Sequence, residues 1–592
     1  MGSYFQSGKG VRQGDPLSPL LFNLAADALA KMIQQAQKND LIQGLVPDYV
    51  DKGIAILQYA DDTILCLQDE DDTAQNMKLL LYLYEQLSGL KINFEKSEVL
   101  MISQDEGKSL RYAELFNCAV GQWPMKYLGV PVCGSRLHIK DWLPLDEKLT
   151  KRLGGWQGNS LSFGGRLTLL NSCLSSIPIY SMSLYMLPKT IHKRLDKTRK
   201  RFFWQGGGIK KKYYLVKWTK AARPKNKGGL GIQDLWKLNV SLLCKWWWKL
   251  EACQGIWQTI VMKKYVKDKN IAQLKVKPVN SPVWNDLLKI KDIYLKGRVM
   301  CVGNGQFIDF WRDSWCGMIS LKEKFPDLFD ICNETTGSVA LFANRGWNLS
   351  FRRWLDERQQ ESVRKLRDML APCALSSERD YPKWLGERDG KFSVKSQYAS
   401  LWAADTEDKN KNLWKAKIPL KIKVFMWLVK SNAILTKDNL SKKGWQGDQT
   451  CSFCSTLENT EYLFFGCAMA RYCWSLVSIV IGADCRPSSF SQFWVWAAKY
   501  MPHHKKIFMV GLAAICWALW RTRNSICFED KKYRSPTEII CLASSFLFYW
   551  AGLQNPQGKL ELMMGAEALK NTALSFHPQE APPEDAGLVL LR

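Results

Sequence analysis

The first part of the chain has apolar positions at the spacing of an amphipathic helix. Asp15 suits the N-cap of this helix and Pro16 its first helical position, where proline loses no intrahelical hydrogen bond. Pro19 still falls in the first turn. The apolar residues that follow share one helical face: Leu17, Leu20, Leu21, Leu24 and Ala28. The pattern therefore predicts a helix with one apolar side.

A strand pattern surrounds a pair of acids further along the chain. Residues 54–59 alternate between two faces, and residues 63–66 form a second, mostly apolar run. Two strands joined by the segment Tyr59–Asp62 place Asp61 and Asp62 at the tip of a hairpin. Adjacent carboxylates repel each other, and a Mg²⁺ ion held by them and by substrate phosphates relieves the repulsion. For an isolated Asp-Asp turn, a solvated loop is the alternative.

Helical patterns dominate the rest of the chain. The apolar faces of helices in residues 140–205 are supplied by Leu153, Trp156, Leu161, Leu167 and Leu170. Residues 270–410 show short strand and turn signals without a long periodic helix, whereas residues 506–553 are helical again. The consecutive Trp246, Trp247 and Trp248 point in three directions on a helix. At least one of them therefore belongs to a core, and stacking surfaces for nucleic-acid bases are the alternative use.

The charge distribution indicates a polyanionic partner. The chain of 592 residues carries a formal net charge of +27, and residues 189–227 contain fifteen Lys or Arg against one acid, Asp196. Such a concentration favours contact with a phosphate backbone, through which counterions are released. Lys210, Lys211 and Lys212 are the candidate backbone contacts within this stretch. A solvated basic surface is the alternative.

Cysteine usage and hydropathy predict reduced, intracellular thiols and no membrane-spanning segment. There are 18 Cys and no apolar segment of signal-peptide type at the start, so reduced thiols are expected. The longest apolar stretch, residues 507–520, is shorter than the roughly 20 residues that cross a bilayer. It predicts a buried helix.

Several blocks together resemble a known family. The segment Arg12–Phe22 and the Tyr59–Asp62 segment resemble two signature motifs of reverse transcriptases, and Ser88–Ser97 is similar to the next palm motif. Tyr127, Leu128 and Gly129 resemble the primer-grip turn. The later blocks resemble those of plant LINE-type (non-LTR) retrotransposon proteins: Gly228–Ile232, Gly303–Gly305, Phe310–Trp315, Gly390–Ser396 and Trp520–Asn524. They occur in the family's order over residues of roughly 5–555.

The resemblance implies roles for particular residues. Asp61 would bind the catalytic magnesium, with Asp62 supporting it. Arg12, Gln13 and Gly14 would border the incoming nucleotide and the template, and Lys96 would lie near the nucleotide phosphates unless it is a solvated lysine on a turn. The segment Tyr127–Gly129 would hold the primer end. The partners would be RNA and DNA, with no membrane, and nuclear action would suit the family.

The resemblance also identifies an expected residue that this sequence lacks. Such enzymes place another metal-binding Asp on a palm strand before the Gln13-Gly14 block, whereas only twelve residues precede Gln13 here and none is acidic. The two-metal scheme needs carboxylates from both strands. We therefore expect no processive polymerase activity from this chain alone. A truncated palm is also expected to leave apolar surface exposed.

A cysteine cluster resembles the zinc-binding domain of the same family. Cys451, Cys454 and Cys467 have the spacing of a zinc knuckle, and Cys473 is the candidate fourth ligand. The family usually has a His where this chain has Tyr462, and a neutral phenol is a weaker metal ligand than imidazole. Small buried apolar cysteines in a helical pair are the alternative.

These observations predict an α+β, mostly α, protein of six segments. The predicted segments are a partial palm (1–135), thumb-like helices (136–205), a basic, Trp-rich connector (206–409), a zinc-binding-like domain (410–480), a helical segment (481–560) and a loose tail (561–592). The predicted function is that of a retrotransposon-derived RNA-directed DNA polymerase that is catalytically defective. A non-catalytic nucleic-acid-binding protein and a group II intron maturase are the alternatives. The blocks at 303–315 and 451–467 disfavour the maturase.

Overall fold

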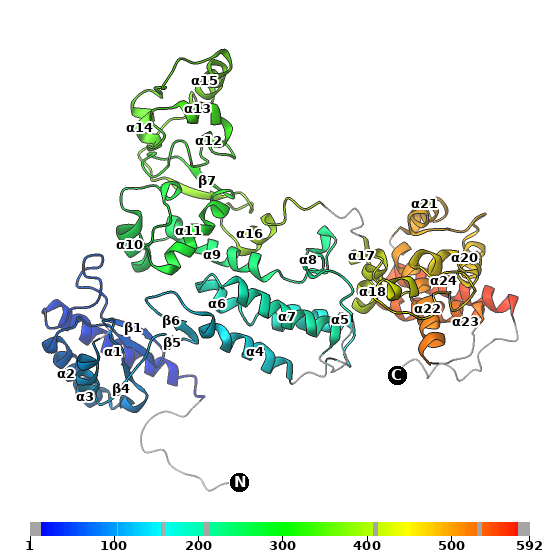
Figure 1. Ribbon diagram of the computed structural model, residues 1–592, viewed down its shortest axis with the longest axis horizontal. Helices are drawn as coiled ribbons and strands as arrows, with labels where there is room; N and C mark the ends of the chain where they lie inside the picture. Colours follow the sequence, from blue (N-terminus) through cyan, green and yellow to red (C-terminus); the bar gives the residue numbers. More distant parts are fainter. Residues whose placement is uncertain are drawn as a thin grey trace, which may run out of the picture. The chain divides into compact units, whose positions relative to one another are not determined.

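The computed structural model describes residues 14–103, 105–154, 158, 160–206, 213–406, 412–505, 507–529 and 535–577 (Figure 1). They form two compact units, each assembled from separate segments of the chain. Unit 1 comprises Met1–Pro144, Tyr180–Pro188 and Lys237–Leu401, and unit 2 comprises Leu145–Ile179, Lys189–Trp236 and Trp402–Arg592. Helices predominate and the sheets of the described part have two strands, which confirms the predicted fold class.

Unit 1 begins with two helices and a hairpin around one apolar core. The helix α1(Ser18–Lys38) packs against α2(Asp71–Ser88), and β1(Ile56–Tyr59) pairs antiparallel with β2(Asp62–Leu65) (Figure 1). The core that they share includes Leu29, Ile33, Ala55, Met77 and Leu81. The predicted mixture of helix and strand in this region is confirmed.

The first helix begins two residues later than the sequence predicts. Its N-cap is Leu17, so the prediction of Asp15 as the N-cap and Pro16 as the first helical residue was wrong. Asp15 still stabilises the start, because its Oδ1 accepts a hydrogen bond from the Leu17 backbone N–H at 2.9 Å. Pro19 lies in the first turn, where its missing N–H leaves no gap in the hydrogen bonding.

The predicted apolar side of α1 is exposed over its first half. Leu20 and Leu24 are 62% and 70% exposed, and Leu17 and Leu21 are exposed beside them. A different side of the helix, including Leu29 and Ile33, fills the core. The first half of α1 therefore presents four exposed leucines.

Small elements complete the N-terminal region of unit 1. In chain order they are η1(Phe94–Lys96), β3(Glu98–Val99), α3(Glu106–Phe116), β4(Ala119–Val120), β5(Met125–Tyr127) and β6(Val130–Val132). The strands β3 and β4 are parallel, whereas β5 and β6 form an antiparallel hairpin. Leu128 and Gly129 make the turn of this hairpin.

The tryptophan-rich helix α9(Leu235–Ala252) contributes to the second hydrophobic core of unit 1. Trp247 is 1% exposed, and its Nε1 donates to the Leu287 carbonyl at 3.1 Å. Trp246 and Trp248 are partly buried and pack against the same core. The expectation that at least one of the three is a core residue is confirmed.

Two long helices lie in the region where the sequence predicts none. They are α11(Pro282–Leu295) and α15(Glu357–Leu370), each of 14 residues, so the prediction for residues 270–410 was wrong on this point. In α15 the buried apolar residues are Leu366 and Leu370, and most of their neighbours are charged or polar. The apolar residues are therefore too few to show a helical period in the sequence. A capping box between Asp356 and Gln359 starts that helix instead.

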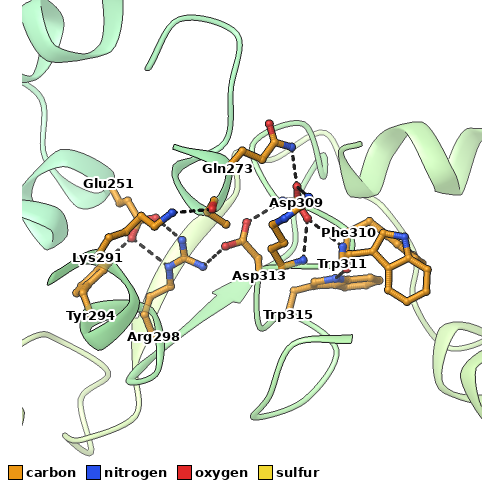
Figure 2. Close-up of polar contacts among 12 residues, drawn as sticks. Glu251, Gln273, Lys291, Tyr294, Arg298, Asp309, Phe310, Trp311, Asp313 and Trp315 are labelled. Atoms are coloured by element: carbon orange, nitrogen blue, oxygen red, sulfur yellow. Dashed lines mark hydrogen bonds and ion pairs between the residues drawn. The ribbon is translucent and has the colours of Figure 1, made fainter. Parts of the chain in front are cut away.

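A buried ion network joins this region to α9. Arg298 begins β7(Arg298–Cys301), which pairs antiparallel with β8(Tyr381–Trp384). The Nη2 and Nε of Arg298 donate to the Glu251 carboxylate at 2.6 and 3.2 Å, and its Nη1 donates to Asp313 at 2.7 Å (Figure 2). Burial opposes the charge on Arg298, but the two carboxylates hold its pKa above the usual range.

The network also orders the Phe310–Trp315 block. The backbone N–H of Asp309 donates to Asp313 at 2.7 Å, and the Asp309 carboxylate accepts from the N–H groups of Trp311 and Arg312 (Figure 2). Burial raises the pKa of Asp309. Because the acids of this block are saturated by buried donors, the block has a structural role.

Unit 2 is helical throughout its core. Its helices in chain order include α5(Phe163–Leu169), α7(Lys189–Gln205), α18(Leu420–Lys430), α20(Ala468–Ile481), α22(Phe508–Glu529) and α23(Pro536–Ala551). The helix α5 crosses α18 so closely that a Cβ at Gly164 would lie 2.7 Å from the Lys421 nitrogen, so glycine is required there. With α4(Leu143–Gly154) and α6(Ile179–Leu184), the helices α5 and α7 confirm the helices predicted for residues 140–205, except that Trp156 lies outside the described residues.

The predicted loose tail is wrong over its first half. The helix α24(Pro556–Phe576) packs against α23, and it begins with Asn555 as N-cap and Pro556 in the first turn. Leu562, Ala566, Leu569 and Ala573 recur on one buried face of α24. Over the part of the chain that the structure describes, no helix has the length and apolarity needed to span a bilayer.

Candidate functional site

The two adjacent acids lie at the tip of the β1–β2 hairpin, as predicted. Tyr59 pairs with Asp62, so Ala60 and Asp61 form the two-residue turn, and Ala60 adopts a left-handed φ of 52°. Both carboxylates are exposed. Among the described residues, no hydrogen bond or ion pair engages either side chain. The tip therefore presents two unneutralised negative charges to solvent.

The β5–β6 hairpin lies next to this acidic tip. Burial raises the pKa of the Tyr127 hydroxyl, and the negative charge of Asp62 raises it further. Leu128 and Gly129 have φ values of 47° and 81°, the left-handed pair that a tight two-residue hairpin needs. The structure thus brings the predicted primer-grip turn and the predicted metal-binding acids together.

The predicted nucleotide-binding residues are only partly placed. Arg12 and Gln13 lie outside the described residues. Gly14 is exposed with a φ of 89°, and Lys96 is exposed at the end of η1, where the Asn93 side chain accepts from its backbone N–H at 3.1 Å. In the part of the chain that is described, no contact joins the Lys96 side chain to Asp61 or Asp62. Its role in phosphate binding stays a prediction.

Among the described residues, no third metal-binding group lies beside the acidic tip. Over the described ranges, one set of three His, Cys, Asp or Glu ligands has the geometry to hold a metal ion, and it is Cys451, Cys454 and Cys467. Asp61 and Asp62 are thus two adjacent carboxylates without a partner on a neighbouring strand among these residues.

The helix α7 carries a row of cations on one side. Lys189, Lys193, Lys197 and Arg201 are exposed and recur every four residues, which spaces them about 6 Å apart along the helix. Within the described chain, no acidic side chain pairs with any of these four. We name them the α7 basic row. Arg199, on the same helix, is fully buried and donates to Asp196, so it does not belong to the row.

The predicted backbone contacts Lys210, Lys211 and Lys212 lie outside the described residues. The sequence-based interpretation treated the whole 189–227 stretch as one basic surface and did not separate the α7 basic row from it. The four-residue period of the row was readable in the sequence.

The three cysteines of the knuckle meet at the start of α20. The segment 451–454 forms a turn, in which the Cys454 N–H donates to the Cys451 carbonyl at 3.3 Å, and Cys467 is the N-cap residue of α20. Their sulfur atoms lie within 4.8 Å of one another. Cys451 and Cys467 are buried, and Cys454 is half-buried.

The environment favours a thiolate at Cys467. A hydrogen bond with the Cys451 thiol lowers the pKa of Cys467, and the backbone N–H groups of Ala470 and Met469 lower it further. The same hydrogen bond raises the pKa of Cys451, which is the donor. A thiolate at a helix N-terminus is the form in which cysteine binds metal.

Tyr462 is hydrogen-bonded to one cysteine of the cluster. Its hydroxyl lies 3.1 Å from the Cys454 sulfur, and this hydrogen bond raises the pKa of the Tyr462 hydroxyl. Tyr462, which stands where the resemblance leads us to expect a His, thus contacts one of the three sulfurs.

Cys473 is not part of the cluster, so its prediction as a fourth ligand was wrong. It lies within α20, and its sulfur contacts the Pro536 carbonyl at 4.0 Å. Burial raises its pKa to about 12, so it is a protonated core thiol. Cys473 lies six residues beyond Cys467, and the intervening helix turns its side chain to another side.

Three thiols at these distances fit a zinc ion. Tetrahedral zinc holds sulfur at about 2.3 Å, and a small contraction of the cluster would satisfy that distance. Cys451, Cys454 and Cys467 would hold the ion, which would supply a structural cross-link between the turn and α20.

Comparisons with known proteins match both the acidic tip and the cysteine cluster. The family described as reverse transcriptase (RNA-dependent DNA polymerase) matches residues 2–132, which contain the acidic tip and the β5–β6 hairpin. The family described as zinc-binding in reverse transcriptase matches residues 392–474, which contain the cysteine cluster.

Relatives of the chain come from plants and from transposable elements. An Arabidopsis thaliana protein described as a putative ribonuclease H protein is 30% identical over 55% of this chain and 54% of its own length. An uncharacterized 149 kDa protein of transposon TX1 from Xenopus laevis is 27% identical over 38% of this chain and 16% of its own length. The Pol polyprotein of the type-1 retrotransposable element R2 from Popillia japonica is 34% identical over 17% of this chain and 16% of its own length. The chain thus spans about half of the first of these relatives and less of the others.

Proposed function

We propose that this chain is a member of the reverse transcriptases of non-LTR retrotransposons and that it binds template and primer strands of RNA and DNA without extending them by itself. The observation that carries the proposal is the acidic tip, where Asp61 and Asp62 stand exposed beside Tyr127 with no third carboxylate among the described residues. The family match supports the polymerase ancestry. The set of two carboxylates among the described residues supports the part of the proposal that concerns extension.

The acidic tip fits magnesium only as a partial site. Two neighbouring carboxylates attract a divalent cation, and Mg²⁺ is commonly bound by one or two carboxylates together with substrate phosphates. Magnesium, when bound, would neutralise phosphate charge at the primer end. A pair of ions in fixed positions, however, needs carboxylates on more than one strand. We therefore infer that Asp61 attracts an ion without fixing its position.

The α7 basic row supports binding of a nucleic-acid backbone. The four cations on one side of the helix have no acidic partners among the described residues, so they break no ion pairs when they bind phosphates. Each phosphate contact releases counterions. The stretch 189–227 holds a large share of the chain's positive charge, as the sequence predicts. Binding through this row would depend on salt and not on base sequence.

Binding and extension are measured on one preparation of the full chain. Fluorescence anisotropy reports binding to an RNA template annealed to a DNA primer, and gel analysis reports extension with Mg²⁺ and all four nucleotides. The proposal predicts binding in the presence and absence of Mg²⁺ and no extension above that of Asp61→Asn. Extension that depends on Asp61 contradicts the catalytic part, and absence of any binding contradicts the whole.

A matched pair of variants tests the α7 basic row. Lys193→Ala with Lys197→Ala removes two unpaired cations, whereas Arg364→Ala with Lys365→Ala removes two cations that pair with Glu361. Both variants lower the net charge by two. The first is expected to reduce the salt slope, log K against log salt, by about 1.4–1.8. Equal slopes for the two variants exclude the row as a phosphate contact.

A maturase function is not favoured, because the zinc-binding family match and the retrotransposon relatives point elsewhere. A purely non-catalytic nucleic-acid-binding role differs from the proposal only in ancestry, and the reverse transcriptase match supports descent from a polymerase.

A further inference from the structure

Unit 1 contains a pocket with an aromatic lining beside the β5–β6 hairpin. Its volume is about 470 Å³, which lies within the range of small-molecule sites. Six of the lining side chains are aromatic and partly exposed: Tyr127, Tyr180, Tyr185, Trp246, Trp257 and Tyr265. The sequence-based interpretation assigned no function to Tyr180, Tyr185, Trp257 or Tyr265, which are scattered along the chain.

The rings are held in place by the core beneath them. Trp246 and Trp257 lie 4.9 Å apart, and the Trp246 Nε1 donates to the Ser183 carbonyl at 2.7 Å. Tyr265 stacks on buried Trp284 with ring centroids 5.0 Å apart. Such rings offer flat faces that need no rearrangement before stacking with a ligand.

The surroundings of the pocket are positively charged. Lys249 lies 5.2 Å from the Trp246 ring centroid, and Lys264 lies 5.5 Å from that of Tyr265. None of the residues that line the pocket is acidic. Asp286, next to the lining residue Leu287, already pairs with Lys289 at 2.7 Å. Near Trp246 and Tyr265 the charge therefore suits an anionic ligand.

Tyr127 relates the pocket to the acidic tip. Tyr127 lines the pocket and also feels the charge of Asp62. Tyr127, Tyr180 and Tyr185 all line the pocket, and the charge of Tyr180 contributes to the raised pKa of the Tyr127 and Tyr185 hydroxyls. A ligand here would have an apolar, flat part against the rings and polar edges near the hydroxyls.

From these features we infer that the pocket binds unpaired bases of a single-stranded nucleic-acid segment next to the primer-grip hairpin. Stacking surfaces combined with lysines are the means by which proteins bind single strands without sequence preference. An apolar side chain of a partner protein would use the rings but would not need the lysines. The inference rests on the proposed function, because it concerns the same nucleic acid.

The test uses the full chain and two labelled probes of equal length and charge. One is a ten-residue thymidine oligonucleotide, and the other is a ten-residue abasic oligonucleotide with the same phosphates. Trp257→Leu and Tyr180→Leu each remove one ring, and Tyr180 is 47% exposed, so its loss leaves the core intact. Trp257→Phe keeps a ring, and Trp354→Leu removes a ring that is 96% exposed in another part of unit 1.

The inference predicts tighter binding of the thymidine probe than of the abasic probe. Trp257→Leu and Tyr180→Leu are each expected to weaken thymidine binding by roughly five- to 150-fold and to leave abasic binding unchanged. Trp257→Phe and Trp354→Leu are expected to bind like the unmodified chain. The α7 basic row variant should weaken both probes equally.

Equal affinity for the two probes, or equal losses on both probes in the ring variants, overturns the inference. A change of self-association in Tyr180→Leu without a change in thymidine binding also overturns it, in favour of a second copy as the occupant. If one of these outcomes occurs while the chain still binds a template–primer duplex, the pocket inference fails and the proposed nucleic-acid binding is retained. Loss of all nucleic-acid binding by the unmodified chain indicates failure of the proposed function instead.

Discussion

Replacing Arg298 by methionine should destabilise unit 1 far more than replacing a surface arginine does. The Glu251 and Asp313 side chains are 8% and 1% exposed and both depend on the Arg298 guanidinium. Arg298→Met would leave two buried carboxylates without their cation. Breaking a buried ion pair in this way typically costs about 3–5 kcal/mol. The local unfolding equilibrium should therefore rise by roughly two to four powers of ten.

The assay is native-state hydrogen exchange of the amides in the β7–β8 ladder, since global unfolding of two units is not a single transition. Arg345→Met is the matched control, because Arg345 pairs with Glu334 at 2.6 Å and both side chains are about half exposed. Its effect should stay below about 1 kcal/mol. Arg298→Lys, which keeps the charge and loses the forked geometry, should fall between the two. Equal effects of Arg298→Met and Arg345→Met would refute the reasoning.

Three further outcomes are expected. Cys467→Ser should lower bound zinc from about one equivalent to less than half, as measured by elemental analysis of the chain purified without chelator. Cys473→Ser should leave the zinc content unchanged, because Cys473 is a core thiol. Equal losses of zinc in the two variants would contradict the three-cysteine site. Leu20→Gln with Leu24→Gln should reduce aggregation measured by light scattering and shift stability by less than about 0.5 kcal/mol, since both side chains are exposed; a large loss of stability would show that the α1 face is packed. Lys193→Ala with Lys197→Ala should flatten the salt dependence of duplex binding relative to the control variant Arg364→Ala with Lys365→Ala. An unchanged slope would show that the α7 basic row does not contact the duplex.

The sequence predicted the acidic hairpin because strand alternation and a two-residue turn are local properties. Asp61 and Asp62 reach the tip for the same reason. The electrostatic effect of Asp62 on Tyr127 is a tertiary feature, and only the roles that the resemblance to reverse transcriptases assigns to the two segments pointed to it. No local pattern contains that proximity.

The failures also have physical causes. Cys473 was assigned to the metal by its nearness in sequence, but a helix separates its side chain from Cys467. The helix α24 was missed because the prolines that follow it dominate the composition of the tail, while its buried face holds only small and medium residues. The helix α15 was missed because few of its residues are buried.

The later family blocks proved to be structural where the structure describes them. Asp313 holds buried Arg298, Arg523 pairs with buried Glu458 at 2.6 Å, and the Gly228 carbonyl accepts from Trp427 Nε1 at 2.9 Å. From sequence alone, a buried acid in an ion network looks the same as a catalytic acid. Burial and partners separate the two, and both are properties of the fold.

Above all, this polypeptide is expected to retain the acidic tip without a working metal site. Single-nucleotide incorporation, measured with an excess of the full chain over a labelled primer on an RNA template in Mg²⁺, tests this most directly. We predict no incorporated nucleotide above the level seen with Asp61→Asn, although the primer is bound. Incorporation by the unmodified chain that disappears in Asp61→Asn would contradict the proposed loss of catalysis.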